Sequence, residues 1–198
     1  MIIGLTGGIA TGKSTVSQIV RNQGIPIVDA DIISREVVMP GKEAYEKIVS
    51  SFGAGILHED ETINRAQLGE IIFNDAEKRS VLNNIVHPAV RKEMRLQADS
   101  YLKSGESLVI MDIPLLFESK LTHMVNRTWL VYAKPEIQLE RLMLRDDFTE
   151  QQALSRIQSQ MPIDEKKKLA DIVIENNGSL TELESRVLQL LNDTKNRP

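Results

Sequence analysis

The residues GGIATGKS at positions 7–14 have the types and the spacing needed to bind a chain of phosphates. They match the pattern G-x-x-x-x-G-K-[S/T], in which successive backbone N–H groups converge on an anion at the start of a helix. Glycines at 7 and 12 permit backbone angles and a close approach that a side chain would block. Lys13 can reach the β- and γ-phosphates of a nucleoside triphosphate, and the Ser14 hydroxyl can ligate Mg²⁺. The pattern therefore predicts a triphosphate site.

An ordinary glycine-rich turn could match this pattern by accident. At usual residue frequencies the four fixed positions coincide in roughly 1% of chains of this length. Here an apolar run (1–6) precedes the loop and a helical pattern (13–23) follows it. That is the context a phosphate-binding loop requires. We therefore interpret 7–14 as such a loop, with Thr15 facing the α-phosphate.

Two carboxylates end the second apolar run, in the sequence VDADIISR (28–35). Asp29 and Asp31 fall at the carboxyl edge of the predicted sheet, where open α/β folds place ligands. A carboxylate there can orient an attacking hydroxyl or hold Mg²⁺ through water. Either could instead cap the helix that begins near Ile32. We assign the cap to Asp29, which leaves Asp31 as the candidate for chemistry.

Three arginines follow the fourth predicted strand. Arg141 and Arg145 are one helical turn apart in RLMLRDD, and Arg156 comes fifteen residues after Arg141. Guanidinium groups on a mobile lid can close over a triphosphate and neutralise charge that develops during transfer. The alternative is a set of solvated helix arginines paired with Glu140 and Asp146. The position after the fourth strand favours the lid function for Arg145.

The segment LVIMD (108–112) is an apolar run that ends in an aspartate. This form is typical of the strand whose carboxylate supports Mg²⁺ in triphosphate-binding folds. The next residues, IPLLF (113–117), form an apolar ledge that ends at Glu118. Composition alone favours core packing for this ledge over a ligand-binding surface.

Five short apolar runs alternate with helical patterns along the chain. Each run is apolar nearly throughout, as in strands buried on both faces of a parallel sheet. The runs are 1–6, 25–30, 107–112, 127–133 and 171–176, and the clearest helical patterns are 13–23, 135–145 and 179–192. This alternation predicts an α/β fold with a parallel five-stranded sheet.

The interval 31–105 breaks the alternation, because it has helical patterning and no convincing strand. It is longer than a single crossover needs. We predict a helical insertion at 31–105, a nucleotide-binding core at 1–30 and 106–198, and a short lid at about 141–160. Within the insertion, Pro88 interrupts an amphipathic pattern, which predicts that a helix ends or kinks near His87.

Composition limits the classes of protein to consider. The chain has 198 residues, 41% hydrophobic and 26% charged, which indicates one globular domain with small insertions. A net charge of −4, without interleaved basic and aromatic residues, argues against nucleic acid or an anionic membrane as a partner. The chain has no cysteine, which excludes disulfides and thiolate chemistry. Because we find no signal peptide and no long apolar span, we expect a cytoplasmic location.

Triphosphate-binding loops serve switches, motors and small kinases. A guanine-nucleotide switch would usually carry Asn-Lys-x-Asp after a strand, and this tetrapeptide does not occur here. The residues DIPL (112–115) also differ from the Asp-x-x-Gly expected near its third strand. Motors usually need a longer chain. The residues therefore favour a small kinase with a hydroxyl acceptor, while a nucleoside monophosphate kinase and a nucleotide-dependent regulatory binder stay open as alternatives.

Segments throughout the chain occur in the order in which one enzyme family has them. They are GLTGGIATGKST (4–15), VDADIISREVV (28–38), HPAVR (87–91), DIPLLFE (112–118), RLMLRD (141–146) and ADIVIENNG (170–178). On these segments the whole chain resembles the dephospho-coenzyme A kinase family. The resemblance implies a three-layer P-loop kinase with a helical substrate-binding insertion and a short lid. It also implies transfer of the γ-phosphoryl group of ATP, with Mg²⁺, to the ribose 3′-hydroxyl of dephospho-coenzyme A, the last step of coenzyme A synthesis.

The resemblance also implies functions for individual residues. Asp31 would face the 3′-hydroxyl, Arg145 would act from the lid, and the insertion 31–105 would receive the acceptor. The implied nucleotide-binding residues are Ala10, Thr11, Gly12, Lys13, Ser14, Thr15, Arg141 and Asn177, the last near the adenine. The implied acceptor-site residues are His87, Pro88, Pro114, Leu115, Leu116 and Glu118.

The remaining polar candidates have simpler interpretations. His58 and His123 have no partner at metal-ligand spacing and are predicted to be surface residues. The run DEKKK (164–168) is predicted to be a solvated helix face. Trp129 and Phe117 are predicted to belong to the core or to a pocket wall. We expect a monomer or a small homo-oligomer.

Overall fold

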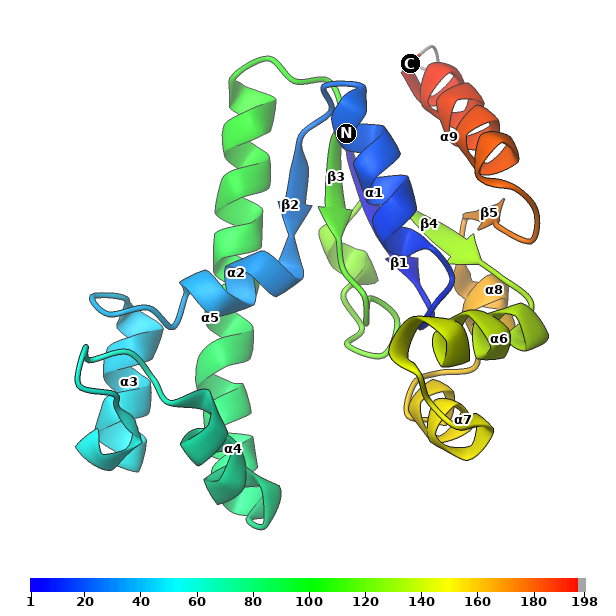
Figure 1. The fold of residues 1–198 in the computed structure, drawn as a ribbon. Coiled ribbons are helices and arrows are strands. Elements are labelled where there is room, and N and C mark those ends of the chain that lie inside the picture. Colours follow the sequence, from blue (N-terminus) through cyan, green and yellow to red (C-terminus); the bar gives the residue numbers. More distant parts are fainter. Residues whose placement is uncertain (196–198) are drawn as a thin grey trace. The chain divides into compact units, whose positions relative to one another are not determined.

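The computed structural model describes residues 1–195 (Figure 1). The chain divides into two compact units by its internal contacts. One unit comprises residues 1–28 and the residues from 98 onward, and the other comprises residues 29–97. The first unit carries the phosphate-binding loop, and the second is mainly helical.

A parallel five-stranded sheet forms the centre of the first unit. Its strands are β1 (Ile2–Gly7), β2 (Ile27–Asp29), β3 (Val109–Asp112), β4 (Arg127–Tyr132) and β5 (Ile172–Glu175), in the order β2-β3-β1-β4-β5. β1 pairs in parallel with β3 and β4, and Leu5 lies opposite Asp112 and Trp129. The predicted fold class and strands are confirmed. Because β1 is central, the loop after it emerges at the middle of the carboxyl edge.

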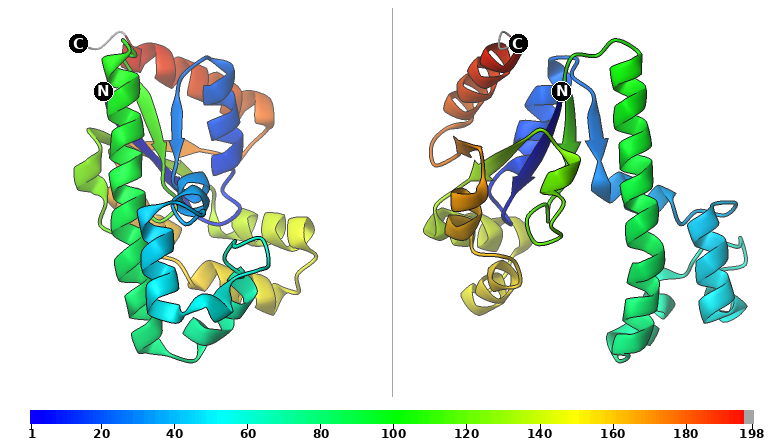
Figure 2. Two further views of the ribbon diagram at one scale, coloured as in Figure 1. Left: turned by 90° about the vertical axis from the view of Figure 1, so that its left-hand side faces the viewer. Right: turned by 180° about the vertical axis from the view of Figure 1, so that it is seen from behind.

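Helices cover both faces of this sheet (Figures 1 and 2). Helices α1 (Lys13–Asn22) and α9 (Leu180–Lys195) pack on one face, where Trp129 is fully buried in their shared core. On the other face, Leu130 packs against Ile163 of α8 (Ile163–Leu169). Neighbouring residues of β4 thus serve opposite faces, as strand geometry requires. A strand with apolar partners on both sides accounts for the continuous apolar runs.

The remaining elements of the first unit follow β3 and β4. The 3₁₀ turn η2 (Thr122–Met124) precedes β4. Helices α6 (Pro135–Asp146) and α7 (Glu150–Gln158) follow β4 and lie near the loop at the carboxyl ends of β1 and β4 (Figure 1). α7 begins with a capping box, in which the Thr149 hydroxyl and the Gln152 side chain bond each other's backbone N–H groups. This cap fixes where the chain re-enters helix after α6.

Four helices and a 3₁₀ turn make up the second unit. They are α2 (Ala30–Glu36), α3 (Glu43–Phe52), η1 (Ala54–Ile56), α4 (Arg65–Phe73) and most of α5 (Ala76–Lys103). Ile48, Ile56 and Leu68 form a small buried core in it. A bridge between Leu57 and Ile63 closes the turn that connects η1 with α4.

Pro88 does not end a helix. It lies inside α5, which continues from Ala76 to Lys103, so of the two outcomes predicted near His87, a helix end or a kink, the helix end is wrong. An interior proline removes one backbone hydrogen bond and costs about 3 kcal/mol. Val86 packs against the core of the second unit and Met94 is fully buried, so apolar contacts before and after the proline favour a continuous helix.

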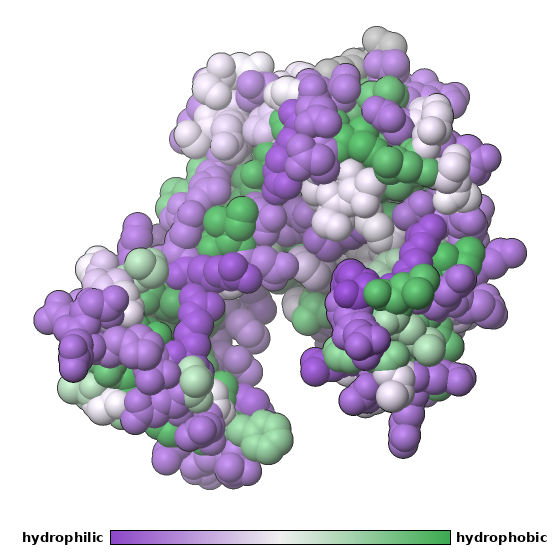
Figure 3. Space-filling model, in the orientation of Figure 1, coloured by the Kyte–Doolittle hydropathy of each residue, from purple (hydrophilic) through white to green (hydrophobic). Residues whose placement is uncertain are grey.

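Hydrophilic residues dominate the face of the molecule shown in Figure 3, with small apolar areas between them. Within residues 1–195, no helix combines the length and the apolar character needed to cross a lipid bilayer.

Replacing Ile110 in β3 tests the sheet core directly. Ile110 is fully buried in the core that the sheet shares with α1 and α9, so Ile110→Ala should lower the free energy of unfolding by about 2–5 kcal/mol. Urea unfolding followed by circular dichroism measures this loss. Leu144→Ala is the control, because 79% of Leu144 is exposed and the change should stay within about 0.5 kcal/mol. Equal losses in the two variants would contradict the packing described.

Candidate active site

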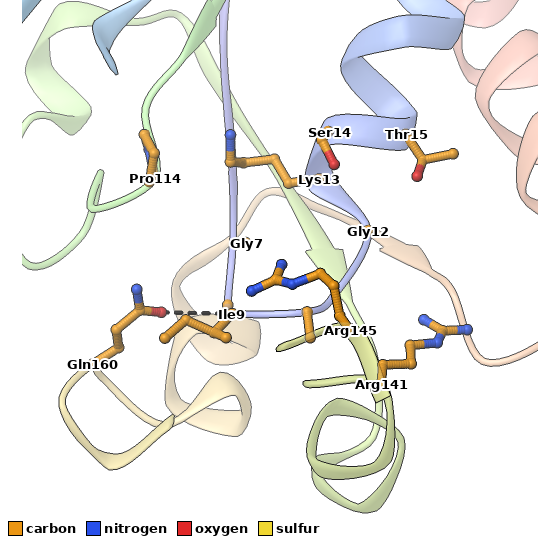
Figure 4. Close-up of a pocket in the computed structure, with 12 residues that line it drawn as sticks. Gly7, Ile9, Gly12, Lys13, Ser14, Thr15, Pro114, Arg141, Arg145 and Gln160 are labelled. Carbon is orange, nitrogen blue, oxygen red and sulfur yellow. Dashed lines mark hydrogen bonds between the residues drawn. The ribbon is translucent and has the colours of Figure 1, made fainter. Parts of the chain in front are cut away.

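A cavity of about 460 Å³ opens at the carboxyl edge of the sheet in the first unit (Figure 4). The loop and the first turn of α1 surround it, together with α6 and the residues that follow β3 and α7. Of the residues implied by the resemblance, Ala10, Gly12, Lys13, Ser14, Thr15, Pro114, Arg141 and Arg145 line this cavity. Ile9, within the predicted loop 7–14, also lines it, as does Gln160, which sequence reasoning did not identify.

The glycines of the loop are required by contacts behind it. Gly12 has φ +89° and precedes α1, a conformation that L side chains rarely adopt. A Cβ atom at Gly12 would also collide with the side-chain amide of Asn176. A Cβ at Gly7 would lie 2.6 Å from Oγ1 of Thr11 and 3.2 Å from the backbone carbonyl oxygen of Val131. The pattern recognised in the sequence therefore has a steric cause at both positions.

Side chains behind the loop hold its carbonyl groups. Nε2 of Gln138 donates to the carbonyl of Ile9 at 2.7 Å, and Nδ2 of Asn176 donates to the carbonyl of Thr11 at 2.8 Å. The C=O and N–H of a trans peptide group point in opposite directions. Each bond thus turns the N–H of the following residue away from the supporting side chain. The following residues are Ala10 and Gly12, and both line the cavity. The result is a set of donors suited to an anion.

Lys166 supplies a third bond of this kind. Its ammonium donates to the carbonyl of Gly7 at 3.2 Å and pairs with Oε1 of Glu118 at 2.7 Å. Lys166 has no exposed surface, so the prediction of a solvated face for 164–168 is wrong at this position. Lys167 and Lys168 are exposed as predicted. Helical residues three positions apart share a face, and Lys166 points inward on the same face as the buried Ile163.

The Lys13 ammonium lies beside a buried carboxylate. Its Nζ is 2.5 Å from Oδ1 of Asp112, and the hydroxyl of Ser17 donates to Oδ2 at 2.6 Å. The Asp112 side chain is only 4% exposed, while that of Lys13 is 20% exposed and borders the cavity. The end of β3 therefore positions the lysine at the rim, within the first turn of α1.

The two arginines of α6 extend in different directions from their helix (Figure 4). Arg141 donates to the backbone carbonyl of Asn176 at 3.0 Å, which ties α6 to the end of β5. Arg145 is largely exposed and donates two hydrogen bonds, of 2.8 and 2.9 Å, to the carboxylate of Asp146. These bonds hold the pKa of Asp146 below its ordinary value. Arg156 stacks over the Phe148 ring at 5.8 Å instead of lining the cavity.

The segment after β3 is fixed to the sheet at its start. Thr6 donates its hydroxyl hydrogen bond to the carbonyl of Pro114 at 2.9 Å. Leu115 is 42% exposed, whereas Leu116 is fully buried and packs close to Gly4 of β1. Glu118 bonds Lys166, as described above. The four residues of this segment implied for the acceptor thus have different environments.

The other predicted residues of the first unit lie behind the loop, on the surface or in the core. Thr11 is fully buried behind the loop, and its hydroxyl donates to the carbonyl of Gly8 at 2.9 Å. The side chain of Asn177 accepts a hydrogen bond from the backbone N–H of Lys134 at 2.9 Å. His123 is an exposed surface residue, as predicted. Trp129 and Phe117 are buried.

Asp31, His87 and His58 belong to the second unit, and all three are exposed. Asp29 caps α2, because its Oδ1 accepts from the backbone N–H groups of Asp31 and Ile32 at 3.0 and 3.1 Å. The assignment of the cap to Asp29 is confirmed. The functions implied for Asp31 and His87 stay predictions.

Metal binding depends first on how acidic and histidine side chains are arranged. Within the described part of the chain, no group of three or more His, Cys, Asp or Glu residues is placed to hold a metal ion. Mg²⁺ keeps several waters and is often held by one or two protein groups together with substrate phosphates. The exposed Ser14 hydroxyl, at the start of α1 and on the cavity wall, fits an ion of that kind.

Comparisons with known proteins identify the family. The sequence model for dephospho-CoA kinase matches residues 1–182. The chain belongs to the dephospho-CoA kinase family. A relative named dephospho-CoA kinase from Bacillus cereus is 56% identical over 96% of each chain. A solved dephospho-CoA kinase from Campylobacter jejuni is 31% identical, with a TM-score of 0.77 over 98% of this chain and 96% of its own.

The same fold extends beyond the dephospho-CoA kinase family. Shikimate kinase from Aquifex aeolicus has a TM-score of 0.52 over 99% of both chains at 19% identity, which shows a shared fold alone. The sheet and loop are therefore an architecture shared with other P-loop kinases, and membership of this family rests on the sequence match.

Removing the Lys13 ammonium should abolish most of the activity. Lys13→Ala is expected to lower the rate of ADP formation by about 10²-fold or more, because a preorganised cation next to the phosphates is lost. The measurement is a coupled ADP assay on protein whose folding is checked by circular dichroism. Lys167→Ala is the control, since this exposed lysine pairs with Glu175 on the surface. An active Lys13→Ala enzyme would undermine the assignment of the loop.

Proposed function

We propose that the protein transfers the γ-phosphoryl group of ATP to the ribose 3′-hydroxyl of dephospho-CoA, the final step of coenzyme A synthesis. Membership of the dephospho-CoA kinase family over nearly the whole chain is the observation that carries this conclusion. The cavity supports it, because main-chain donors and a rim lysine converge where a triphosphate would lie.

The loop would bind the triphosphate through backbone N–H groups and Lys13. The side chains behind it have already oriented these groups, so binding requires little reorganisation, which is the basis of electrostatic preorganisation. Lys13 would exchange Asp112 for the phosphate oxygens. When bound through Ser14, Mg²⁺ would neutralise charge on the β- and γ-phosphates.

Asp31 is the proposed carboxylate for the acceptor. It would accept a hydrogen bond from the 3′-hydroxyl and orient the oxygen in line with the γ-phosphorus. Two features support this choice: Asp31 is exposed, and Asp29 supplies the cap of α2. Asp31 therefore has no need to serve as the N-cap of its own helix.

Arg145 is proposed to stabilise the transferring group from the lid at about 141–160. Its present partner, Asp146, is a surface carboxylate, and ion pairs of that kind contribute at most about 1 kcal/mol. Arg145 can therefore exchange Asp146 for phosphate oxygens at a small cost in free energy. Arg141 is proposed to hold the end of β5 in place through its bond to the Asn176 carbonyl. Asn177, the next residue, would lie near the adenine of the nucleotide.

The acceptor is assigned to the insertion 31–105, including His87, and to the segment after β3. In that segment Pro114 borders the cavity and Leu115 is exposed, so these two are proposed to contact dephospho-CoA directly. An apolar surface there would suit the pantetheine arm. Leu116 and Glu118 would instead shape the segment, since one lies in the core and the other pairs with Lys166.

A coupled assay of ADP release tests the function. ADP should form rapidly from Mg·ATP when dephospho-CoA is present and only slowly without it. Nucleoside monophosphates, tested as alternative acceptors in parallel, should not replace dephospho-CoA. Slow ATP hydrolysis that no acceptor accelerates would instead favour a regulatory nucleotide-binding protein.

Replacing Asp31 tests the proposed acceptor carboxylate. Asp31→Asn should lower turnover by roughly 10²–10⁴-fold, because the amide cannot take the proton of the hydroxyl. Binding of ATP, measured by calorimetry, should change little. Glu59→Gln is the matched control, since it also neutralises an exposed carboxylate of the second unit. Near-normal turnover in Asp31→Asn would assign this function to another residue.

A further inference from the structure

A fully buried lysine contacts the back of the phosphate-binding loop. Lys166 projects from α8, and its ammonium lies 3.2 Å from the carbonyl oxygen of Gly7 and 2.7 Å from Oε1 of Glu118. Gly7 is the last residue of β1 and pairs with Val131 of β4. Lys166 thus acts at the junction where the rigid strand becomes the loop.

We propose that Lys166 is a positioning residue for the phosphate-binding loop, with Glu118 as its counterion. This proposal rests on the kinase function proposed above and assigns part of its phosphate affinity to a residue outside the loop motif. A bond to the Gly7 carbonyl fixes the peptide group between Gly7 and Gly8, and so directs the N–H of Gly8 to the opposite side. Gly8 borders the cavity, and its N–H becomes the first donor of the anion nest.

The charge of Lys166 points to more than a packing function. Taking an ammonium and a carboxylate out of water is costly, and apolar residues of similar volume often fill such a site with equal or better stability. Glu118 offsets much of the positive charge, so Lys166 acts on the loop mainly through its hydrogen bond to the Gly7 carbonyl. A buried ion pair that is kept despite its desolvation cost, with the ammonium bonded to the loop, favours a positioning function.

Glu118 connects this cation to the segment between α7 and α8. Its Oε1 also accepts from the backbone N–H of Met161 at 3.2 Å. The neighbouring Gln160 accepts from the backbone N–H of Ile9 at 3.2 Å. Oε2 of Glu118 is buried and has no hydrogen-bond partner among the described residues. The carboxylate is therefore held by Lys166 and by the backbone at one end of the lid segment.

The test compares Lys166→Met, which keeps the length and removes the charge, with Lys166→Arg, which keeps the charge. The probe is Mg²⁺ with inorganic tripolyphosphate, which samples the loop without adenine or acceptor, and binding is measured by calorimetry. Lys166→Met should weaken tripolyphosphate binding about tenfold, the effect of losing a charged hydrogen bond. The KM for ATP should rise similarly, while the KM for dephospho-CoA stays within about twofold.

Two further variants separate positioning from folding. Lys168→Met is the control on the same helix, because Lys168 is exposed and pairs with Glu165 on the surface; it should bind tripolyphosphate like the wild type. Lys166→Arg should recover at least part of the binding lost in Lys166→Met. If Lys166→Met does not fold, the double variant with Glu118→Gln, which leaves no unpaired buried charge, is measured in its place.

The outcomes are distinct. Folded Lys166→Met, or the double variant, with wild-type affinity for tripolyphosphate would overturn the proposal. The proposal would also be overturned if Lys166→Arg folds but binds tripolyphosphate as weakly as Lys166→Met. A lower melting temperature with unchanged phosphate affinity would indicate a purely structural residue. If the wild type does not phosphorylate dephospho-CoA but its tripolyphosphate binding still depends on Lys166, the proposed kinase function is refuted. The proposal that Lys166 positions the loop then still holds.

Discussion

The orientation of a few peptide groups after β1 is the constraint on which this structure depends. An anion site made of main-chain N–H groups works only if the carbonyls of the same peptides are satisfied elsewhere, because a buried carbonyl without a donor is costly. Gln138, Asn176 and Lys166 supply those donors from α6, the end of β5 and α8. The order of the strands places all three elements behind the loop. The topology of the sheet thus brings the three donors to the carbonyl groups of the loop.

This constraint explains which parts of the site could be predicted from the sequence. The loop itself was evident, since its glycines and lysine are contiguous and each has a strict steric or electrostatic reason. The strands were evident because both faces of the sheet are covered. Asp29 was one of two possible caps for the helix predicted to begin near Ile32, and the structure confirms the choice.

The supporting residues were not predictable by the same reasoning. Lys166 lies 159 positions from Gly7 in the chain, and a run of three lysines carries no periodic signal for which one faces inward. Gln138 and Asn176 have ordinary side chains whose value depends on packing that only the fold creates. Pro88 shows the reverse case, in which a strong local rule was overridden because burial along α5 outweighs one missing hydrogen bond.

The pair formed by Lys13 and Asp112 has a consequence for the order of events at the site. If the ammonium moves onto phosphate, one oxygen of a buried aspartate loses its partner while Ser17 keeps the other. An uncompensated buried carboxylate would then favour any cation that reaches it together with the nucleotide. Nucleotide and metal would thereby raise each other's affinity, a thermodynamic coupling built from a single exchange of partners.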